Sequence, residues 1–308
     1  MKKWDWNDYQ INSPERIDNH NTMKKNETIV IRKASGKEEF FSFQKLRNSL
    51  LRSNATENET DEIVEKLKPQ LYQGISTKKI YSLAFRMLKE QSSENASRYY
   101  LKKGIMELGP SGFPFEKYVS HLFEHEGFST EVGVILPGKC VTHEIDVICK
   151  KEETLMLMEC KYKNQSGINV DVKVPLYIHS RFQDLLQNDL LQKPFTTFKG
   201  WIVTNSRFTE DALAFGHCSG INLLGWDLPF KNSLKDIIDR TGLYPITCLS
   251  SLTQIEKKWF LEKGIVLISD LSTNHKLFSR AKISEKRSQM IIAECEKLSN
   301  PKLQKIQN

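Results

Sequence analysis

The sequence predicts an α/β (α+β) fold in which a mixed β-sheet flanked by helices lies between two mostly helical parts. Three apolar, strand-like segments follow one another at 130–136, 142–150 and 154–163. Helical periodicity precedes and follows them, and a strand, a helix and a last strand close the region at 197–226. This order of elements is typical of a mixed sheet with helices on both faces.

The region before the sheet, residues 27–109, predicts a compact and mostly helical domain. A short strand at 28–32 and a turn at 34–37 precede four helical segments, at 41–53, 59–71, 77–91 and 96–108. Ser76 is a candidate N-cap for the third helix. The sequence Gly109-Pro110-Ser111-Gly112 breaks the periodicity and predicts a domain boundary.

Within the predicted central domain, residues 110–230, helical spacing covers 113–127, 173–189 and 209–217, and strands cover 197–204 and 221–226. The remainder, residues 231–308, is predicted to be helical, with turns near Gly242, Gly264 and Ser284. Residues 1–26 are predicted to form a polar, flexible tail.

Composition limits the class of protein. A chain of 308 residues is long enough for two or three domains. No run of 18 apolar residues occurs, and the N-terminus has no apolar signal region, so we expect no membrane span and no secretory signal. The six cysteines show no zinc-like spacing, which predicts free thiols in a reducing cytoplasm.

The charge is divided unevenly along the chain. The net charge is +7, and the outer parts are basic, with +5 over residues 1–110 and +5 over 251–308, whereas residues 111–228 carry −4. An acidic centre with basic neighbours suits a metal-binding core whose flanks hold nucleic acid. Ordinary solubilising surface charge would give the same totals.

The most informative motif is His143-Glu144-Ile145-Asp146-Val147, followed by a second apolar strand that ends in Glu159-Cys160-Lys161. Because side chains alternate along a strand, Glu159 and Lys161 should share one face and Cys160 the other. A hairpin of the two strands would bring Asp146 beside Glu159. Two carboxylates and a lysine suit metal-assisted phosphodiester hydrolysis, in which the carboxylates hold a divalent cation and the lysine positions the attacking water. The alternative is a cross-strand ion pair at an exposed strand end.

Two other acid-x-Lys triplets lack this context. Glu256-x-Lys258 lies in a segment of helical spacing, and Asp171-x-Lys173 follows a poor strand and predicts a loop or helix start.

Two residues of the motif and two on the following helix are further candidates. By strand alternation Glu144 could reach the site with Asp146, whereas His143 is predicted to be a packed or hydrogen-bonded core residue. Arg181 and Asp184 are predicted to form a structural ion pair one helical turn apart, with the orientation of DNA phosphates as the alternative.

Residues 112–229 resemble the PD-(D/E)XK nuclease superfamily, and within it the catalytic domain of Mrr-like restriction endonucleases. The resemblance rests on Phe115-Glu116, the two strand motifs and the late segment Gly200-Trp201-Ile202-Val203-Thr204-Asn205. It implies that Asp146, Glu159 and the Cys160 carbonyl ligate Mg²⁺ and that Lys161 serves the attacking water. Glu116 matches the acid that such domains often place on their first helix.

Residues 29–108 resemble the ATP-cone, a nucleotide-sensing domain. The residues that carry the resemblance are Lys33, Gly36, Phe41, Lys45, Thr77 and Ile80. The resemblance implies that ATP or dATP binds at Lys33, Gly36, Lys45 and Thr77 as an effector. A helical domain used for dimerisation or DNA contact is the alternative.

The C-terminal segment resembles helix-hairpin-helix DNA-binding modules, through Leu261-Glu262-Lys263-Gly264-Ile265 and the basic helix at 284–298. The resemblance implies DNA contacts at Gly264, Lys282, Lys286 and Arg287, although Lys282 stands where a glycine would be more typical. An ordinary helical subdomain is the alternative.

Together these patterns predict a magnesium-dependent DNA endonuclease of restriction or defence type, regulated by ATP or dATP and acting as a homodimer or higher homo-oligomer. Two alternatives stay open: a nucleotide-responsive DNA-binding regulator with an inactive nuclease fold, and a repair or junction-resolving nuclease.

Overall fold

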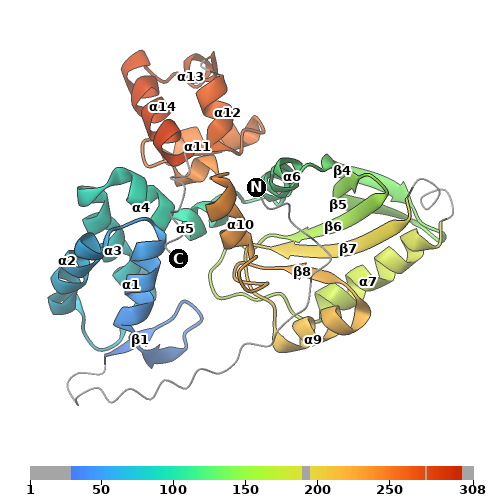
Figure 1. The fold of residues 1–308 in the computed structure, drawn as a ribbon, viewed down its shortest axis with the longest axis horizontal. Coiled ribbons are helices and arrows are strands. Elements are labelled where there is room, and N and C mark those ends of the chain that lie inside the picture. The colour runs from blue at the N-terminus through green and yellow to red at the C-terminus, as the bar shows by residue number, and fades with distance from the viewer. Residues whose placement is uncertain (1–28, 189–194, 275, 300–308) are drawn as a thin grey trace, which may run out of the picture.

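The computed structural model describes residues 29–188, 195–274 and 276–299 (Figure 1). The predicted tail at 1–26 lies outside the described residues. In Figure 1 the N-terminal domain and the C-terminal helices lie to one side of the central sheet. Helix α5 (Leu101–Met106) leads from the N-terminal domain into the central domain.

The N-terminal domain contains a small sheet of order β2-β1-β3. Strand β1 (Val30–Arg32) pairs antiparallel with β2 (Glu38–Phe40) and parallel with β3 (Ile75–Ser76). The helices are α1 (Phe43–Arg52), α2 (Glu57–Leu67), the short 3₁₀ helix η1 (Lys68–Gln70), α3 (Thr77–Gln91) and α4 (Ser93–Tyr99). The Ser76 side chain accepts a hydrogen bond from the Lys79 N–H and caps α3, which confirms the predicted N-cap.

Two details of this region differ from the prediction. Strands β2 and β3 were not predicted, because β3 has two residues and the Glu38-Glu39-Phe40 sequence of β2 shows no apolar alternation. The single helix predicted at 96–108 is two helices, α4 and α5 (Leu101–Met106). The break follows from packing, because Ala96 lies in the N-terminal core whereas Leu101 lies in the core of the central domain.

The central sheet has the order β4-β5-β6-β7-β8 and confirms the predicted mixed α/β architecture. Its strands are β4 (Ser129–Pro137), β5 (Thr142–Lys151), β6 (Thr154–Lys161), β7 (Thr197–Thr204) and β8 (Asn222–Leu224). Strands β4, β5 and β6 pair antiparallel, and β6, β7 and β8 pair parallel. Helix α6 (Phe113–His125) packs on one face, and α7 (Lys173–Leu186) and α9 (Glu210–Ser219) pack on the other (Figure 1).

The C-terminal region is helical, as predicted. Its elements are α10 (Leu234–Thr241), η2 (Ile246–Cys248), α11 (Gln254–Glu262), α12 (Ile268–Thr273), α13 (Lys276–Arg280) and α14 (Glu285–Ser299). Gly242 and Gly264 have φ of +71° and +72° and occupy turns in the left-handed region, where glycine carries no Cβ penalty.

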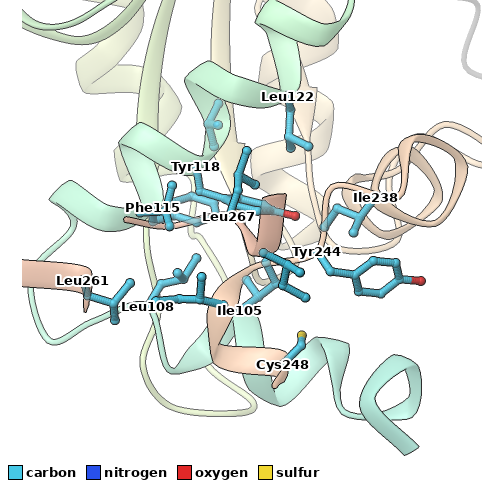
Figure 2. Packing of buried hydrophobic residues seen from close by; sticks show 14 of the residues in the cluster. Ile105, Leu108, Phe115, Tyr118, Leu122, Ile238, Tyr244, Cys248, Leu261 and Leu267 are labelled. Atoms are coloured by element: carbon cyan, nitrogen blue, oxygen red, sulfur yellow. The ribbon is translucent and has the colours of Figure 1, made fainter. Parts of the chain in front are cut away.

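One hydrophobic core joins three parts of the chain. Figure 2 shows Ile105 of α5, Phe115 and Tyr118 of α6, and Tyr244 and Leu267 of the C-terminal region in one packed cluster. The Tyr118 hydroxyl also donates a 2.6 Å hydrogen bond to the Leu243 carbonyl. The C-terminal region and α5 are therefore built into the same core as the sheet.

Two expectations from composition can be compared with the structure. All six cysteines are free, and Cys149, Cys160, Cys248 and Cys295 are buried. Within the described ranges, every helix is too short or too polar to cross a bilayer.

Candidate active site

The β5–β6 hairpin brings Asp146 and Glu159 together at one end of its ladder. Val147 pairs with Met158, so the antiparallel register places Asp146 opposite Glu159 one step further on. The Cys160 N–H donates a 2.6 Å hydrogen bond to Asp146 Oδ2. The aspartate is therefore fixed directly against the strand that carries Glu159 and Lys161.

The alternation of side chains in β5 breaks at Asp146. Ile145 and Ile148 pack in the cluster under α7, whereas Val147 packs in the cluster under α6, although Ile145 and Val147 are two residues apart. Opposite this point in β4, Gly133 has a φ of +68°, and the ladder skips the pair that Gly133 would form with Asp146. The register is the same on both sides of the skipped pair, and alternation also changes in β4, where Val132 packs against one cluster and Val134 against the other. The irregularity is therefore a local distortion of both strands without an extra residue, and glycine accommodates the positive φ.

This break in alternation overturns the parity argument for Glu144, because a period of two does not hold across Asp146. His143 points toward α7, where its Nε2 lies 2.8 Å from Asp184 Oδ2, and it is a hydrogen-bonded residue as predicted. Asp184 also accepts a 2.8 Å hydrogen bond from the Cys140 N–H in the β4–β5 turn.

Both oxygens of Glu159 are bound by cationic side chains. Lys161 Nζ lies 2.5 Å from Oε1, and an Arg181 guanidinium nitrogen lies 2.7 Å from Oε2. The Glu159 side chain is only 6% exposed, whereas Lys161 keeps 32% of its side chain in solvent. Arg181 also donates to the Glu144 carbonyl and lies 5.6 Å from the centre of the Tyr177 ring.

The predicted Arg181–Asp184 ion pair is therefore wrong, because each side chain binds elsewhere. The sequence did not predict the contact of Arg181 with Glu159. The contact joins residues 22 positions apart on a strand and a helix, and no local pattern signals it.

Glu116, in the first turn of α6, belongs to the same cluster. Burial, followed by repulsion from Asp146, Glu144 and Glu159, raises the pKa of Glu116 to about 7. Burial and the charge of Glu159 likewise raise the pKa of Asp146 to about 6, against the opposing hydrogen bond from Cys160. The carboxylates thus exceed the positive charge that Lys161 and Arg181 supply, and a divalent cation would correct this imbalance.

The donor set fits a hard cation such as Mg²⁺. Among the described residues no group of three or more His, Cys, Asp and Glu side chains is placed to hold a metal ion. Mg²⁺ needs fewer, because it keeps several waters and binds proteins through one or two carboxylates. The Cys160 side chain packs in the cluster under α6, on the face opposite Glu159 and Lys161, so the thiol is not placed as a ligand. A role for the Cys160 carbonyl stays a prediction.

The four residues predicted to bind nucleotide gather at one end of the small N-terminal sheet. Lys33 and Gly36 form the β1–β2 turn, in which Gly36 has a φ of +82°. Arg32 pairs with Ser76, so the next residues, Lys33 and Thr77, lie side by side. Lys33 Nζ binds Glu39 at 2.5 Å, and the charges of Lys33 and Lys45 both lower the pKa of Glu39.

The residues predicted to bind DNA lie in the C-terminal turns and α14. Gly264 occupies the first turn, and the second turn is left-handed at Lys282, with a φ of +58°, although no glycine is present. Lys286 is exposed. Arg287 binds Glu256 and the Ser251 carbonyl, so it fastens α14 to α11.

The two rejected triplets lie where the sequence placed them. Glu256 and Lys258 are on helix α11, and Lys258 pairs with Glu262 instead. Asp171 accepts a hydrogen bond from the Lys173 N–H at the start of α7.

Comparison with known proteins agrees with this geometry. Residues 109–227 match a family model described as restriction endonuclease, and residues 244–299 match one described as AF1548-like, C-terminal. The fold and the match together define a nuclease domain of the restriction endonuclease, PD-(D/E)XK type.

An uncharacterized protein from Archaeoglobus fulgidus is 31% identical over 181 residues, which cover 58% of this chain and 99% of that protein. The crystal structure of AF1548, a protein of unknown function, matches with a TM-score of 0.51 and 30% identity, over 61% of this chain and 98% of that chain. The chain belongs to the family of AF1548-like proteins. Both family models match after residue 108, beyond the N-terminal domain.

The raised pKa of Glu116 predicts how stability depends on pH. A carboxyl group whose pKa is higher in the folded state binds more protons there, so stability falls as pH rises from about 4.5 to about 7. Glu116→Gln removes the titrating carboxyl group and therefore this loss of stability at higher pH. We expect the variant to be more stable than the parent protein at pH 8 in EDTA and similar to it near pH 4.5, by urea unfolding. Glu90→Gln, at an exposed position on α3, is the control, and equal pH dependence in Glu116→Gln and the parent would contradict the prediction.

Proposed function

We propose that the protein is a Mg²⁺-dependent DNA endonuclease of restriction or defence type. The observation that supports it best is the convergence of Asp146, Glu159 and Lys161 at the end of the hairpin, inside a domain of nuclease type. Charge is crowded there at a stability cost, which is typical of a functional site.

The proposed reaction adds water across a phosphodiester. A bond forms between the water oxygen and phosphorus, the bond from phosphorus to the 3′ oxygen breaks, and the departing oxygen takes a proton, leaving a 5′-phosphate. When bound, Mg²⁺ would polarise the phosphoryl oxygen and acidify a water. Asp146 and Glu159 would hold it.

Three groups of the protein would orient the metal ligand, assist the attacking water and take up a proton. The Cys160 N–H fixes the orientation of Asp146 in advance, which reduces the reorganisation needed on binding. Lys161 is the more exposed of the two cations on Glu159 and can donate to the attacking water or the phosphate. Glu116, with a pKa of about 7, is suited to taking up a proton near neutral pH.

Asp146→Asn and Glu159→Gln should each slow plasmid cleavage in Mg²⁺ by about a hundredfold or more, because about 3 kcal/mol of transition-state stabilisation is lost. Lys161→Ala should act in the same direction. Asp171→Asn and Lys173→Ala, in the exposed triplet at the start of α7, are the matched controls. Cleavage that survives both carboxylate changes would place the chemistry elsewhere. DNA binding with no cleavage by the parent protein would favour a regulator with an inactive fold.

Arg181 should compete with the cation for Glu159. Arg181→Ala leaves Glu159 with one cationic partner, so the metal-free protein should lose stability while its affinity for Ca²⁺ rises about tenfold, or ~1.4 kcal/mol. Calorimetric titration with Ca²⁺ and thermal unfolding with and without Ca²⁺ measure both effects. Arg47→Ala is the control, because Arg47 binds Asp61 and Glu57 on the surface of the N-terminal domain. Unchanged or weaker Ca²⁺ binding in Arg181→Ala would contradict the competition.

The N-terminal domain is proposed to bind ATP or dATP as an effector, supported by the gathering of Lys33, Gly36, Lys45 and Thr77. Backbone N–H groups of a turn and nearby lysines suit a triphosphate. Calorimetry should detect binding to the parent protein that weakens about tenfold in Lys45→Ala and stays unchanged in Lys66→Ala, at an exposed position on α2. No heat with either nucleotide at saturating protein would refute the proposal.

Double-strand cleavage would require two catalytic sets, so the active species is proposed to be a homodimer or a higher homo-oligomer.

A further inference from the structure

A basic pocket lies between α5 and the loops that follow β6 and β7. Its charged lining residues are Lys102 of α5, Lys163 after β6 and Arg207 after β7. The described residues that line it include no Asp or Glu. The side chains of Gln165 and Asn169 add polar groups to the same wall. The lining therefore favours an anion that accepts several hydrogen bonds.

The walls of the pocket are held in place before any ligand arrives. Asn205 is 3% exposed, and its side chain accepts from the Lys163 N–H and donates to the Lys163 carbonyl, both at 2.8 Å. The Ser206 hydroxyl donates to the Ile168 carbonyl across the same gap. These bonds tie the loop after β6 to the loop after β7, so the position of Lys163 is built into the fold.

The positive charge in the pocket is only partly neutralised. Arg207 pairs with Asp227 at 2.6 Å, but Lys102 and Lys163 form no salt bridge with any described carboxylate. Lys102 lies 5.7 Å from the centre of the Trp226 ring. Desolvation, and then repulsion from Arg207, lowers the pKa of Lys102 although part of the side chain is exposed. A bound anion would relieve this repulsion.

The pocket opens at the end of β6 that carries the candidate active site. Lys163 is two residues beyond Lys161 on the same outgoing segment. Tyr162 between them is directed into the core, where its hydroxyl accepts from the Gly109 N–H at 2.8 Å and donates to the Met106 carbonyl. A DNA strand whose phosphate lies at Lys161 would therefore continue past Lys163.

We propose that this pocket binds a backbone phosphate of the DNA strand next to the cleavage site. The inference rests on the proposed nuclease function and adds a subsite to it. Lysine and amide side chains bind phosphate oxygens and fix the register of the duplex without reading its sequence. Helix α5, which is built into the same core as the sheet, completes the site through Lys102.

The pocket wall also contacts the N-terminal domain. Gly167, in the pocket wall, packs against Ser35 of the β1–β2 turn so closely that a Cβ at Gly167 would lie 3.2 Å from the Ser35 nitrogen. The loop that carries Lys163 is thus pressed between the N-terminal domain and the sheet.

The test measures binding of a labelled DNA duplex to the full chain in Ca²⁺, across a series of salt concentrations. Lys102→Ala and Lys163→Ala should each weaken binding about five- to tenfold at 0.1 M salt and reduce the slope of log K against log salt by about 1. Lys163→Arg should keep both values. Lys66→Ala is the matched control, at an exposed lysine of α2.

Affinity and slope equal to those of Lys66→Ala in both alanine variants would overturn the proposal. Loss of ATP binding with unchanged DNA binding would also overturn it, since the pocket would then take the phosphates of a nucleotide. Cleavage by the parent protein in Mg²⁺ is scored separately. A parent that binds DNA with the expected slopes but does not cut it would refute the nuclease function and leave the phosphate subsite standing.

Discussion

The candidate site depends on one electrostatic constraint: carboxylates that repel one another are held together at the end of the β5–β6 hairpin. The apolar side chains of β6 are buried on both faces, in the cluster under α7 and in the cluster under α6, and a slip of one residue would exchange the two sets. Asp146 is therefore held opposite Glu159 by the core beneath it. The Cys160 N–H, Lys161 and Arg181 then offset part of the repulsion, which leaves a site poised for a further positive charge.

The sequence predicted the parts of this arrangement that arise locally. The Asp146–Glu159 juxtaposition follows from two apolar strands joined by a short turn, and the strand at 197–204 was predicted at its observed bounds. The break in alternation at Asp146 was signalled only by Gly133 inside β4, and a glycine in a strand has several explanations. The contact of Arg181 with Glu159 carried no signal, because it depends on how α7 packs across the sheet.

The division into domains shows the same limit. Gly109-Pro110-Ser111-Gly112 predicts a boundary, yet the structure buries Leu101 and Ile105 on one side of it in the same core as Phe115 on the other. Sequence patterns report where a helix stops, but they do not report which core receives its apolar face. The Tyr162 hydroxyl also joins the two sides of this boundary. Tyr162 follows the boundary, and its hydroxyl binds backbone groups of Met106 and Gly109, which precede Pro110.

This packing determines how the N-terminal domain can influence the nuclease domain. Both family models match after residue 108, and the Archaeoglobus relative aligns with 58% of the chain, so the N-terminal domain extends beyond the residues that the family models match. The N-terminal domain packs against the rest of the chain at two places. The Ser97 hydroxyl of α4 donates a 2.9 Å hydrogen bond to Glu294 of α14, and Ser35 packs on Gly167. A shift of the β1–β2 turn would press directly on the loop that begins after Lys161. An effector bound at that turn would therefore have a route to the candidate site through one loop, without movement of whole domains.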